Sequence, residues 1–440
     1  MKIRVILFFV FCAFALGCSN IWSADSPDIV DNNSQEFPSP IAEPELFSVA
    51  APVPTEEIAS VQLSGEQREY VQTGNDFSFR LLNLLHKESN KSLVFSPLSI
   101  QFALGMTVNG AKGNTANEIV AALGMGDNLT ALNEYCKTLL EQLPATDLNV
   151  ALKMADAMVL NDRFTVLPSY KERIETNFYA PVESISFDNP EEVKALINDW
   201  CSKNTEDLIP SILDDVNPLA VCYLMNALYF KGVWTIPFND ETVKMPFISG
   251  STEKDLDYLT IELAREYAER DNYRIVSIPY GRKKDFVFYI ILPKDNDGLA
   301  EVLDAMTLRE WTEALKSMRK DSLLKICVPE FSTESKYSLN KVLKSIGIKD
   351  AFVNGIADFS GMVQDQNLYI SDGIHKAKLS IDKTGTEGAA VTANEMCGAT
   401  GPSEVSPVTP IEFIADHPFA YVIAERSSGA ILFSGTFDGE

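Results

Sequence analysis

Residues and motifs that build enzyme active sites are scarce in this sequence. Only three of its 440 residues are histidine, His86, His375 and His417. The patterns HExxH, GxSxG and GxxxxGK(S/T), which mark zinc proteases, serine hydrolases and phosphate-binding loops, do not occur. A catalytic centre needs a nucleophile with its base, a metal site or a phosphate cradle, and no pattern here supplies one. We therefore expect neither an enzyme nor a bound cofactor or metal.

Basic residues are also in short supply. The chain has 37 Lys and Arg against 62 Asp and Glu, and its formal net charge is −25 at pH 7. A surface that binds phosphate backbones needs clustered Lys and Arg, so this composition argues against nucleic acid as a partner. The apolar content of 46% is ample for a substantial core.

Cysteine pairs at metal-binding or redox spacing are absent too. The chain has seven cysteines, and no two of them form a CxxC pair. Beyond residue 18 we expect most of them to be buried thiols that act as small apolar side chains. Cys397 is the exception, because it lies in a long segment of small and polar residues, 385–410. A structureless loop of that length in a folded domain is usually functional or disordered.

The N-terminus has the pattern of a targeting signal. Two basic residues precede the apolar run 5–16, which is too short to cross a bilayer comfortably as a helix. We expect residues 1–17 to be a signal peptide that is removed. The sequence Phe14-Ala15-Leu16-Gly17-Cys18 resembles a bacterial lipobox, in which the cysteine becomes the acylated first residue. An ordinary secretory signal with an incidental Cys18 is the alternative.

Residues 18–67 have the composition of a tether. They contain no Lys or Arg, whereas acidic residues and prolines recur throughout. Such a segment cannot bury enough apolar surface to collapse. Behind a lipid-bearing Cys18 it would hold a secreted domain at the bacterial cell envelope, at the outer membrane or the cell surface.

Helix and strand patterns begin near residue 68, so we place the folded domain at 68–440. Asn75 or Asp76 is expected to cap a first helix, and Ser96-Pro97 supplies the cap and first-turn proline of a second. Two apolar runs between 273 and 292 predict a hairpin. Helices and strands alternate without a βαβ rhythm, which indicates the α+β class.

Five short motifs are similar to motifs of the serpin family and occur in serpin order. They are Asn90–Ile100 (NKSLVFSPLSI), Asn109–Gly113 (NGAKG), Asn226–Trp234 (NALYFKGVW), Ala357–Gly361 (ADFSG) and Asp416–Phe419 (DHPF). The resemblance runs from about Gly74 to the C-terminus. It implies one large α+β domain with the serpin fold, which has three β-sheets, about nine helices and an exposed reactive-centre loop. The segment 385–410 resembles that loop.

The resemblance also implies roles for individual residues. Ser96, Ser99, Asn226 and His375 match the shutter, beneath which the serpin central sheet opens, although plain core packing would also explain them. Trp234 matches the tryptophan of the breach, where loop insertion starts. The hinge of the loop is assigned to Gly385, Thr386, Glu387, Gly388, Ala389, Ala390, Val391 and Thr392.

In serpins a protease serine attacks the loop and forms an acyl-enzyme. The freed loop then inserts into the central sheet as a new strand, which distorts the protease before water releases it. Insertion requires small residues on one face of the hinge, and Thr386, Gly388, Ala390 and Thr392 meet that demand. Lys383 departs from the family, which usually has glutamate there, and Gly388 replaces a usual alanine.

Counting by the family spacing places the scissile bond at Ala399-Thr400, with Met396-Cys397 as the rival. A small Ala399 suits elastase-like or subtilisin-like serine proteases, and a cysteine protease is a further candidate target. We therefore expect an inhibitory serpin. The alternative is a non-inhibitory serpin that acts as a binding or chaperone module. Because segment 130–147 contains Lys137 as its one basic residue, we expect no glycosaminoglycan partner, and we expect a monomer.

Overall fold

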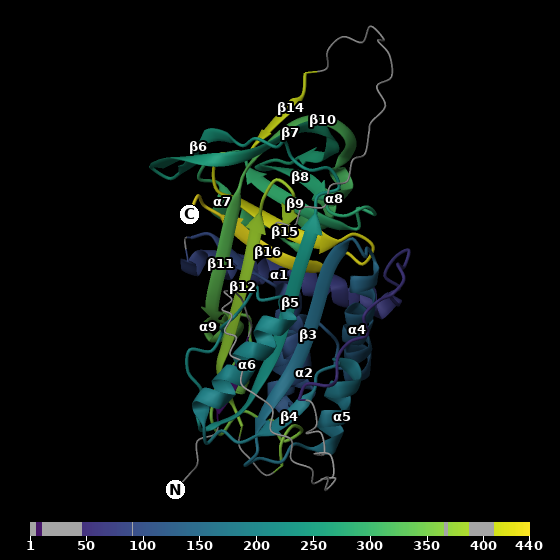
Figure 1. Ribbon diagram of the computed structural model, residues 1–440, viewed down its shortest axis with the longest axis vertical. Helices are drawn as coiled ribbons and strands as arrows, with labels where there is room; N and C mark the ends of the chain where they lie inside the picture. Colours follow the sequence, from purple (N-terminus) through teal and green to yellow (C-terminus); the bar gives the residue numbers. More distant parts are fainter. Residues whose placement is uncertain (1–5, 11–45, 90, 365–367, 387–408) are drawn as a thin grey trace, which may run out of the picture.

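The computed structural model describes residues 6–10, 46–89, 91–364, 368–386 and 409–440 (Figure 1). The strands in these residues form two hydrogen-bonded sheets. The seven-stranded central sheet contains β1 (Ile6–Val10), β3 (Val150–Asn161), β4 (Val182–Ile185), β5 (Ala220–Val233), β11 (Phe331–Ser338), β12 (Ile370–Ile381) and β13 (Gly385–Thr386). The nine-stranded second sheet contains β2 (Leu93–Phe95), β6 (Val243–Ser249), β7 (Thr252–Glu269), β8 (Tyr273–Pro279), β9 (Phe286–Pro293), β10 (Arg319–Pro329), β14 (Ile411–Ile414), β15 (Phe419–Glu425) and β16 (Ile431–Phe437).

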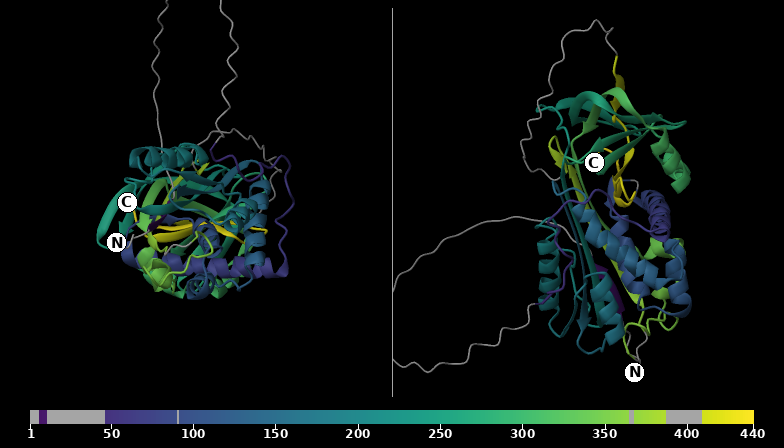
Figure 2. Two further views of the ribbon diagram at one scale, coloured as in Figure 1. Left: turned by 90° about the horizontal axis from the view of Figure 1, so that it is seen from below. Right: turned by 90° about the vertical axis from the view of Figure 1, so that its right-hand side faces the viewer.

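Nine α-helices lie within the described residues, which confirms the expected α+β class and helix number. They are α1 (Gly65–Ser89), α2 (Pro97–Val108), α3 (Gly113–Leu123), α4 (Leu129–Gln142), α5 (Pro168–Asn177), α6 (Pro190–Asn204), α7 (Leu299–Ala305), α8 (Leu308–Ser317) and α9 (Asn340–Ser345). Seen from the side, α6 covers one face of the central sheet, and helices from the N-terminal half cover the other (Figure 2).

Two sheets, rather than the expected three, appear in the described residues because β7 is unusually long. Residues 252–258 of β7 pair with β6, residues 258–267 pair with β10, and residues 267–269 pair with β8. This one strand therefore joins two regions of pairing into a continuous ladder. The predicted hairpin between residues 273 and 292 is confirmed as β8 and β9.

The central sheet has a slot between β5 and β12. Both strands run in the same direction along the long axis of the molecule (Figure 1). At one end the two-residue strand β13 pairs with both of them in antiparallel fashion. At the other end β1, which lies within the predicted signal peptide, pairs with both in parallel fashion. The slot therefore accepts strands of either direction.

Helix α2 packs beneath this sheet and begins as predicted. The Ser96 hydroxyl accepts a hydrogen bond from the backbone N–H of Ser99 at 3.2 Å, and Pro97 occupies the first turn. Every residue of α2 is buried, as expected for a helix that is apolar on all sides.

Helix α1 begins at Gly65, well before the predicted cap at Asn75 or Asp76. Ser64 and Gln67 form a reciprocal capping box: the Ser64 hydroxyl accepts from the N–H of Gln67 at 3.1 Å, and Gln67 Oε1 accepts from the N–H of Ser64 at 2.9 Å. This S-x-x-Q pattern is in the sequence, and it defines the start of the helix. Asn75 instead lies inside α1 and donates to the carbonyl oxygen of Gly429 at 2.8 Å.

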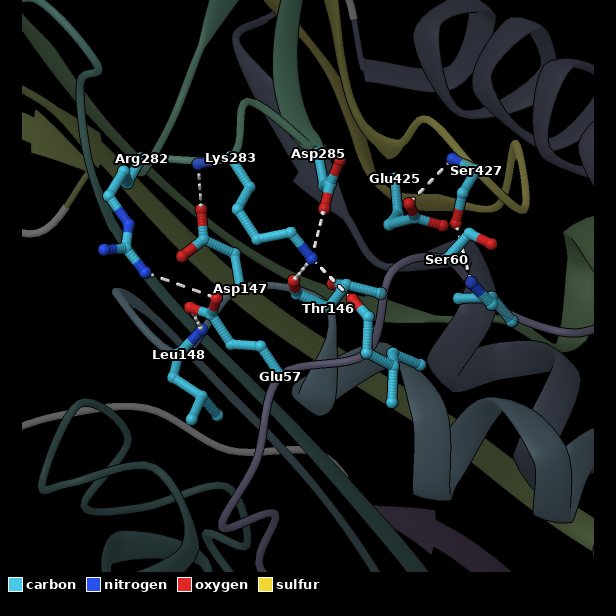
Figure 3. Close-up of polar contacts among 12 residues, drawn as sticks. Glu57, Ser60, Thr146, Asp147, Leu148, Arg282, Lys283, Asp285, Glu425 and Ser427 are labelled. Carbon is cyan, nitrogen blue, oxygen red and sulfur yellow. Dashed lines mark hydrogen bonds and ion pairs between the residues drawn. The ribbon is translucent and has the colours of Figure 1, made fainter.

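Residues 46–64, which we name the N-terminal strap, lie against the folded domain ahead of α1 (Figure 3). Lys283 is its main anchor, because its ammonium group donates to the carbonyl oxygens of Ile58 and Thr146, each at 2.5 Å. The same ammonium group lies 3.2 Å from the Asp285 carboxylate. One side chain therefore joins the strap, the connection between α4 and β3, and the turn between β8 and β9.

Further contacts hold the strap on both sides of Ile58. Glu57 accepts from the N–H of Leu148 at 3.2 Å and pairs with Arg282 at 3.3 Å (Figure 3). Val61 donates its N–H to the Ser427 hydroxyl at 2.9 Å. Within the predicted tether, residues 46–64 therefore pack against the folded domain, whereas residues 18–45 lie outside the described residues. Within the described ranges, every helix falls short of the length and apolar character that a bilayer crossing requires.

Candidate functional site

The candidate site is the end of the slot at which β13 enters the sheet. Gly385 pairs with Val233 of β5, and Thr386 pairs with both Gly232 of β5 and Ile381 of β12. A Cβ at residue 385 would lie 2.0 Å from the carbonyl oxygen of Gly232, so only glycine allows this close pairing. The first two predicted hinge residues are therefore already part of the sheet.

Thr386 points into the protein and is 3% exposed. Its hydroxyl oxygen lies 2.5 Å from that of Tyr280, a fully buried residue that follows β8. The Tyr280 ring in turn occupies space that Gly232 leaves, because a Cβ there would lie 2.8 Å from Cδ1 of the ring. Two glycines thus make room for the Thr386–Tyr280 pair.

Trp234 connects this pair to the turn before the hinge. Its ring stacks on Tyr280 with the centroids 4.3 Å apart, and its Nε1 donates to the carbonyl oxygen of Asp382 at 2.8 Å. The Trp234 backbone N–H donates to the carbonyl oxygen of Thr384 at 2.9 Å. Trp234, which is predicted to mark the start of insertion, thus contacts both Tyr280 and the turn before the hinge.

The turn itself is held by the Asp382 carboxylate. Its Oδ1 accepts from the N–H and the hydroxyl of Thr384, each at 2.6 Å, and from the N–H of Gly385 at 3.0 Å. Lys383 points outward and donates to the carbonyl oxygen of Asp240 at 3.0 Å. Because this contact is exposed, it contributes little to stability.

The four predicted shutter residues come together farther along the slot. Ser96, Ser99, Asn226 and His375 line one small cavity beneath the central sheet. The N–H of Ser96 donates to Nε2 of His375 at 3.1 Å, which places the ring proton on Nδ1. Burial lowers the pKa of His375 to about 3, so the imidazole is neutral.

Asp156 is a member of this cluster that the sequence did not single out. It lies on β3 directly opposite Asn226 on β5, and Asn226 Nδ2 donates to its Oδ1 at 2.8 Å. The sequence gives only a weak indication that Asp156 is buried at this site, because a lone Asp in an alternating strand is commonly an exposed residue. Tyr280 and Asp382 were missed for a similar reason, since nothing in their local sequence marks a hinge contact.

Several predicted site residues lie outside the described residues. These are Glu387, Gly388, Ala389, Ala390, Val391 and Thr392 of the hinge, Ala399 and Thr400 of the scissile bond, and Cys18. Three of the predicted buried thiols, Cys136, Cys222 and Cys327, are buried and free. In the part of the chain that the structure describes, no three His, Cys, Asp or Glu side chains are grouped to hold a metal ion.

In this fold the central sheet already pairs with Gly385 and Thr386, the first two residues of the segment 385–410. The family model described as serpin (serine protease inhibitor) matches residues 72–438. Human Serpin B8 is 32% identical over 382 residues, which cover 83% of this chain and 98% of Serpin B8. The chain belongs to the serpin family, whose members are mostly protease inhibitors and not enzymes.

Solved serpin structures are similar to it throughout the folded domain. The thermophilic serpin tengpin in its native state has a TM-score of 0.76 and 27% identity, with 89% of this chain and 98% of tengpin covered. Human thyroxine-binding globulin, in complex with thyroxine, has a TM-score of 0.75 and 25% identity, with 84% and 98% covered. The N-terminal strap precedes the residues that the family model matches.

Proposed function

We propose that this chain is an inhibitory serpin that traps serine proteases as covalent acyl-enzymes. The observation that carries the proposal is the antiparallel pairing of β13 with both β5 and β12. Continued insertion would follow this register. Six residues on from Thr386 is Thr392, and six residues back along β5 and β12 are Asn226 and His375. Full insertion would therefore place Thr392 between two shutter residues.

The hinge sequence suits the space that it would enter. Residues that share the inward face with Thr386 are Gly388, Ala390 and Thr392, all of them small. Gly388 lowers the strand propensity but blocks nothing sterically. An inserted strand of about ten residues, at about 1 kcal/mol net per hydrogen bond, would gain on the order of 10 kcal/mol. That gain rivals the stability of a whole domain, about 5–15 kcal/mol, so the uncleaved form should be metastable.

The class of target protease is inferred from the sequence around the proposed scissile bond. Ala399 at the scissile bond favours elastase-like or subtilisin-like proteases, because their specificity pockets are shallow. No Lys or Arg occurs between residues 384 and 411, which disfavours trypsin-like targets. A cysteine protease is a second possible target class. We propose a monomer without a glycosaminoglycan activator.

The proposed location is a bacterial cell envelope. Removal of residues 1–17 would leave Cys18 as a lipid-bearing first residue, and residues 18–45 would connect that anchor to the strap. This arrangement would present the reactive-centre loop to proteases that reach the cell surface.

A non-inhibitory binding or chaperone module is the second candidate. Thyroxine-binding globulin, which was solved in complex with thyroxine, shares this fold. The fold alone therefore does not imply protease inhibition. Lys383, at a position where the family usually has glutamate, is the feature that favours this alternative.

One experiment separates the two candidates. The mature protein is mixed with elastase, subtilisin, trypsin and papain, and the products are run on a denaturing gel. An inhibitory serpin gives a covalent complex that survives the denaturant, together with a C-terminal peptide that begins after the scissile bond. Cleavage by every protease without any such complex would leave the non-inhibitory candidate in the lead.

A further inference from the structure

The pair formed by Asp156 and Asn226 lacks one hydrogen-bond donor. Both side chains are buried, with 2% and 1% of their surfaces exposed. Asn226 Nδ2 donates to Asp156 Oδ1, but Asp156 Oδ2 and Asn226 Oδ1 have no hydrogen-bond partner among the described residues. Such atoms are costly, because they lose their hydration and gain nothing in return. An ionised Asp156 carboxylate cannot supply the missing donor, because it carries no proton and only accepts hydrogen bonds.

A single proton on Asp156 would satisfy both of these oxygen atoms. A protonated carboxyl group has one O–H donor, and Oδ2–H could donate to Asn226 Oδ1. The two planar groups would then form two hydrogen bonds in opposite directions. The strand register supports this geometry, because residues 156 and 226 are directly opposite each other on neighbouring antiparallel strands.

The groups packed around Asp156 offer it no positive charge. The buried thiol of Cys136 on α4 interacts electrostatically with Asp156, and the neutral imidazole of His375 on β12 lines the same small cavity as Asn226. Other titratable groups line the cavity beside β3: Lys153, Tyr179, Asp199 and Lys203. Both lysines are already paired at the surface, Lys153 with Glu206 and Lys203 with Asp199. Burial raises the pKa of Asp156 to about 7, and the hydrogen bond from Asn226 opposes that rise only in part.

We propose that Asp156 is protonated in the native protein and that the Asp156–Asn226 acid–amide pair is a pH-sensitive latch that joins β3 to β5 beside the slot. When the pH rises, the proton passes from Oδ2 to solvent and one of the two hydrogen bonds is lost. A buried charge with a single donor then remains next to the shutter. The latch therefore weakens the sheet above neutral pH, whether or not the protein inhibits proteases.

The direction of the pH dependence follows from proton linkage. The folded protein holds its proton more tightly than the unfolded chain, so the stabilisation is complete below the pKa of an unfolded Asp and is lost as the pH rises through about 7. Asp156→Asn is the matched variant. Its amide has nearly the same shape, cannot ionise, and can donate to Asn226 Oδ1.

The first test is an infrared titration of the full mature protein in a Glu330→Gln background, because burial also raises the pKa of Glu330. We expect the stretching band of a protonated carboxyl group at pH 6, its loss by pH 8.5, and no such band in Asp156→Asn. A Glu330→Gln protein with no protonated carboxyl group left at pH 6 would overturn the proposal. This titration, in which Asp156 is intact, decides the question even if Asp156→Asn does not fold.

The second test measures the unfolding equilibrium in denaturant at pH 6 and pH 8.5. Relative to Asp156→Asn, the unfolding constant of the wild type should rise about tenfold over this range. Asp304→Asn removes an exposed carboxylate that is paired with Lys87, and it should leave that rise intact. Equal pH dependence in the wild type and Asp156→Asn would show that the pair is not a latch.

Discussion

The hydroxyl oxygens of Tyr280 and Thr386 lie 2.5 Å apart beneath the central sheet, before any cleavage of the loop. Tyr280 directly follows β8 of the second sheet and Thr386 belongs to the predicted hinge, so this contact connects the second sheet to the start of the hinge. Thr386 is therefore already buried in the sheet at the point where the proposed insertion would begin.

The first prediction concerns this hydrogen bond. Tyr280→Phe should lower the unfolding free energy of the intact protein by about 1–3 kcal/mol, because it leaves the Thr386 hydroxyl buried without its partner. Thr386→Val should have a similar effect, whereas the double variant should cost less than the sum of the two. A double-mutant cycle in denaturant measures the coupling. Tyr421→Phe, which removes a hydroxyl bonded to the carbonyl oxygen of Leu93, is the control and should not couple to Thr386.

The second prediction tests insertion. A charged side chain at residue 386 would not test insertion, because Thr386 is already buried in the intact protein and Thr386→Arg would disturb the sheet before any cleavage. Ala390→Arg is the better variant, since its side chain would face inward only after insertion. An unpaired buried charge costs at least several kcal/mol, a large part of the insertion gain. The variant should be cleaved as a substrate without a stable complex.

Ala389→Arg is the matched control for Ala390→Arg. Residue 389 has the opposite parity, so its side chain would face away from the interior in the inserted strand. We expect this variant to keep most of its covalent complex on a denaturing gel. If both variants lose the complex equally, or if neither does, the loop does not insert in the register that β13 begins.

Much of this architecture could be predicted from the sequence because the signals are local. The cap at Ser96 and the hairpin of β8 and β9 depend on neighbouring residues, and the structure confirms both. The contact between Thr386 and Tyr280 joins residues 106 positions apart, and only the folded sheet brings them together. The N-terminal strap was missed because its composition resembles a tether, whereas many of its contacts are made by backbone N–H and C=O groups, which composition does not report.

The third prediction concerns the strap. Lys283→Met should lower the unfolding free energy by about 1–3 kcal/mol, because two partly buried carbonyl oxygens lose a charged donor. Lys284→Met is the control: the neighbouring side chain is exposed, so its loss should have an effect within about 0.5 kcal/mol. Denaturant unfolding of the mature protein measures both. Equal effects from the two substitutions would mean that the strap does not contribute to stability through Lys283.

The fourth prediction concerns the proposed scissile bond. If Ala399 occupies the specificity pocket, Ala399→Arg should redirect inhibition from elastase-like to trypsin-like proteases. Mass spectrometry of the released C-terminal peptide identifies the bond that is cut. A peptide that begins at Thr400 agrees with the proposed assignment, whereas one that begins at Cys397 would move the scissile bond to its rival position.

The last prediction concerns the signal peptide and β1. In this structure β1 pairs with residues 220–225 of β5. Twelve residues on from Thr386 is residue 398, and twelve residues back from Gly232 is residue 220, so an inserting loop would need the same edge of β5 for its residues 393–398.

One edge of β5 cannot pair with both strands at once, because each backbone donor and acceptor on it is used by a single neighbour. Protein that retains residues 1–17 should therefore be cleaved as a substrate, and protein that begins at Cys18 should form the covalent complex. The two forms are compared on a denaturing gel against the same protease. Phe8→Pro in the longer form removes a backbone donor from β1, so it should restore part of the complex. Equal complex formation by the long and the mature forms would show that β1 does not obstruct insertion, and removal of the signal peptide would then matter for location alone.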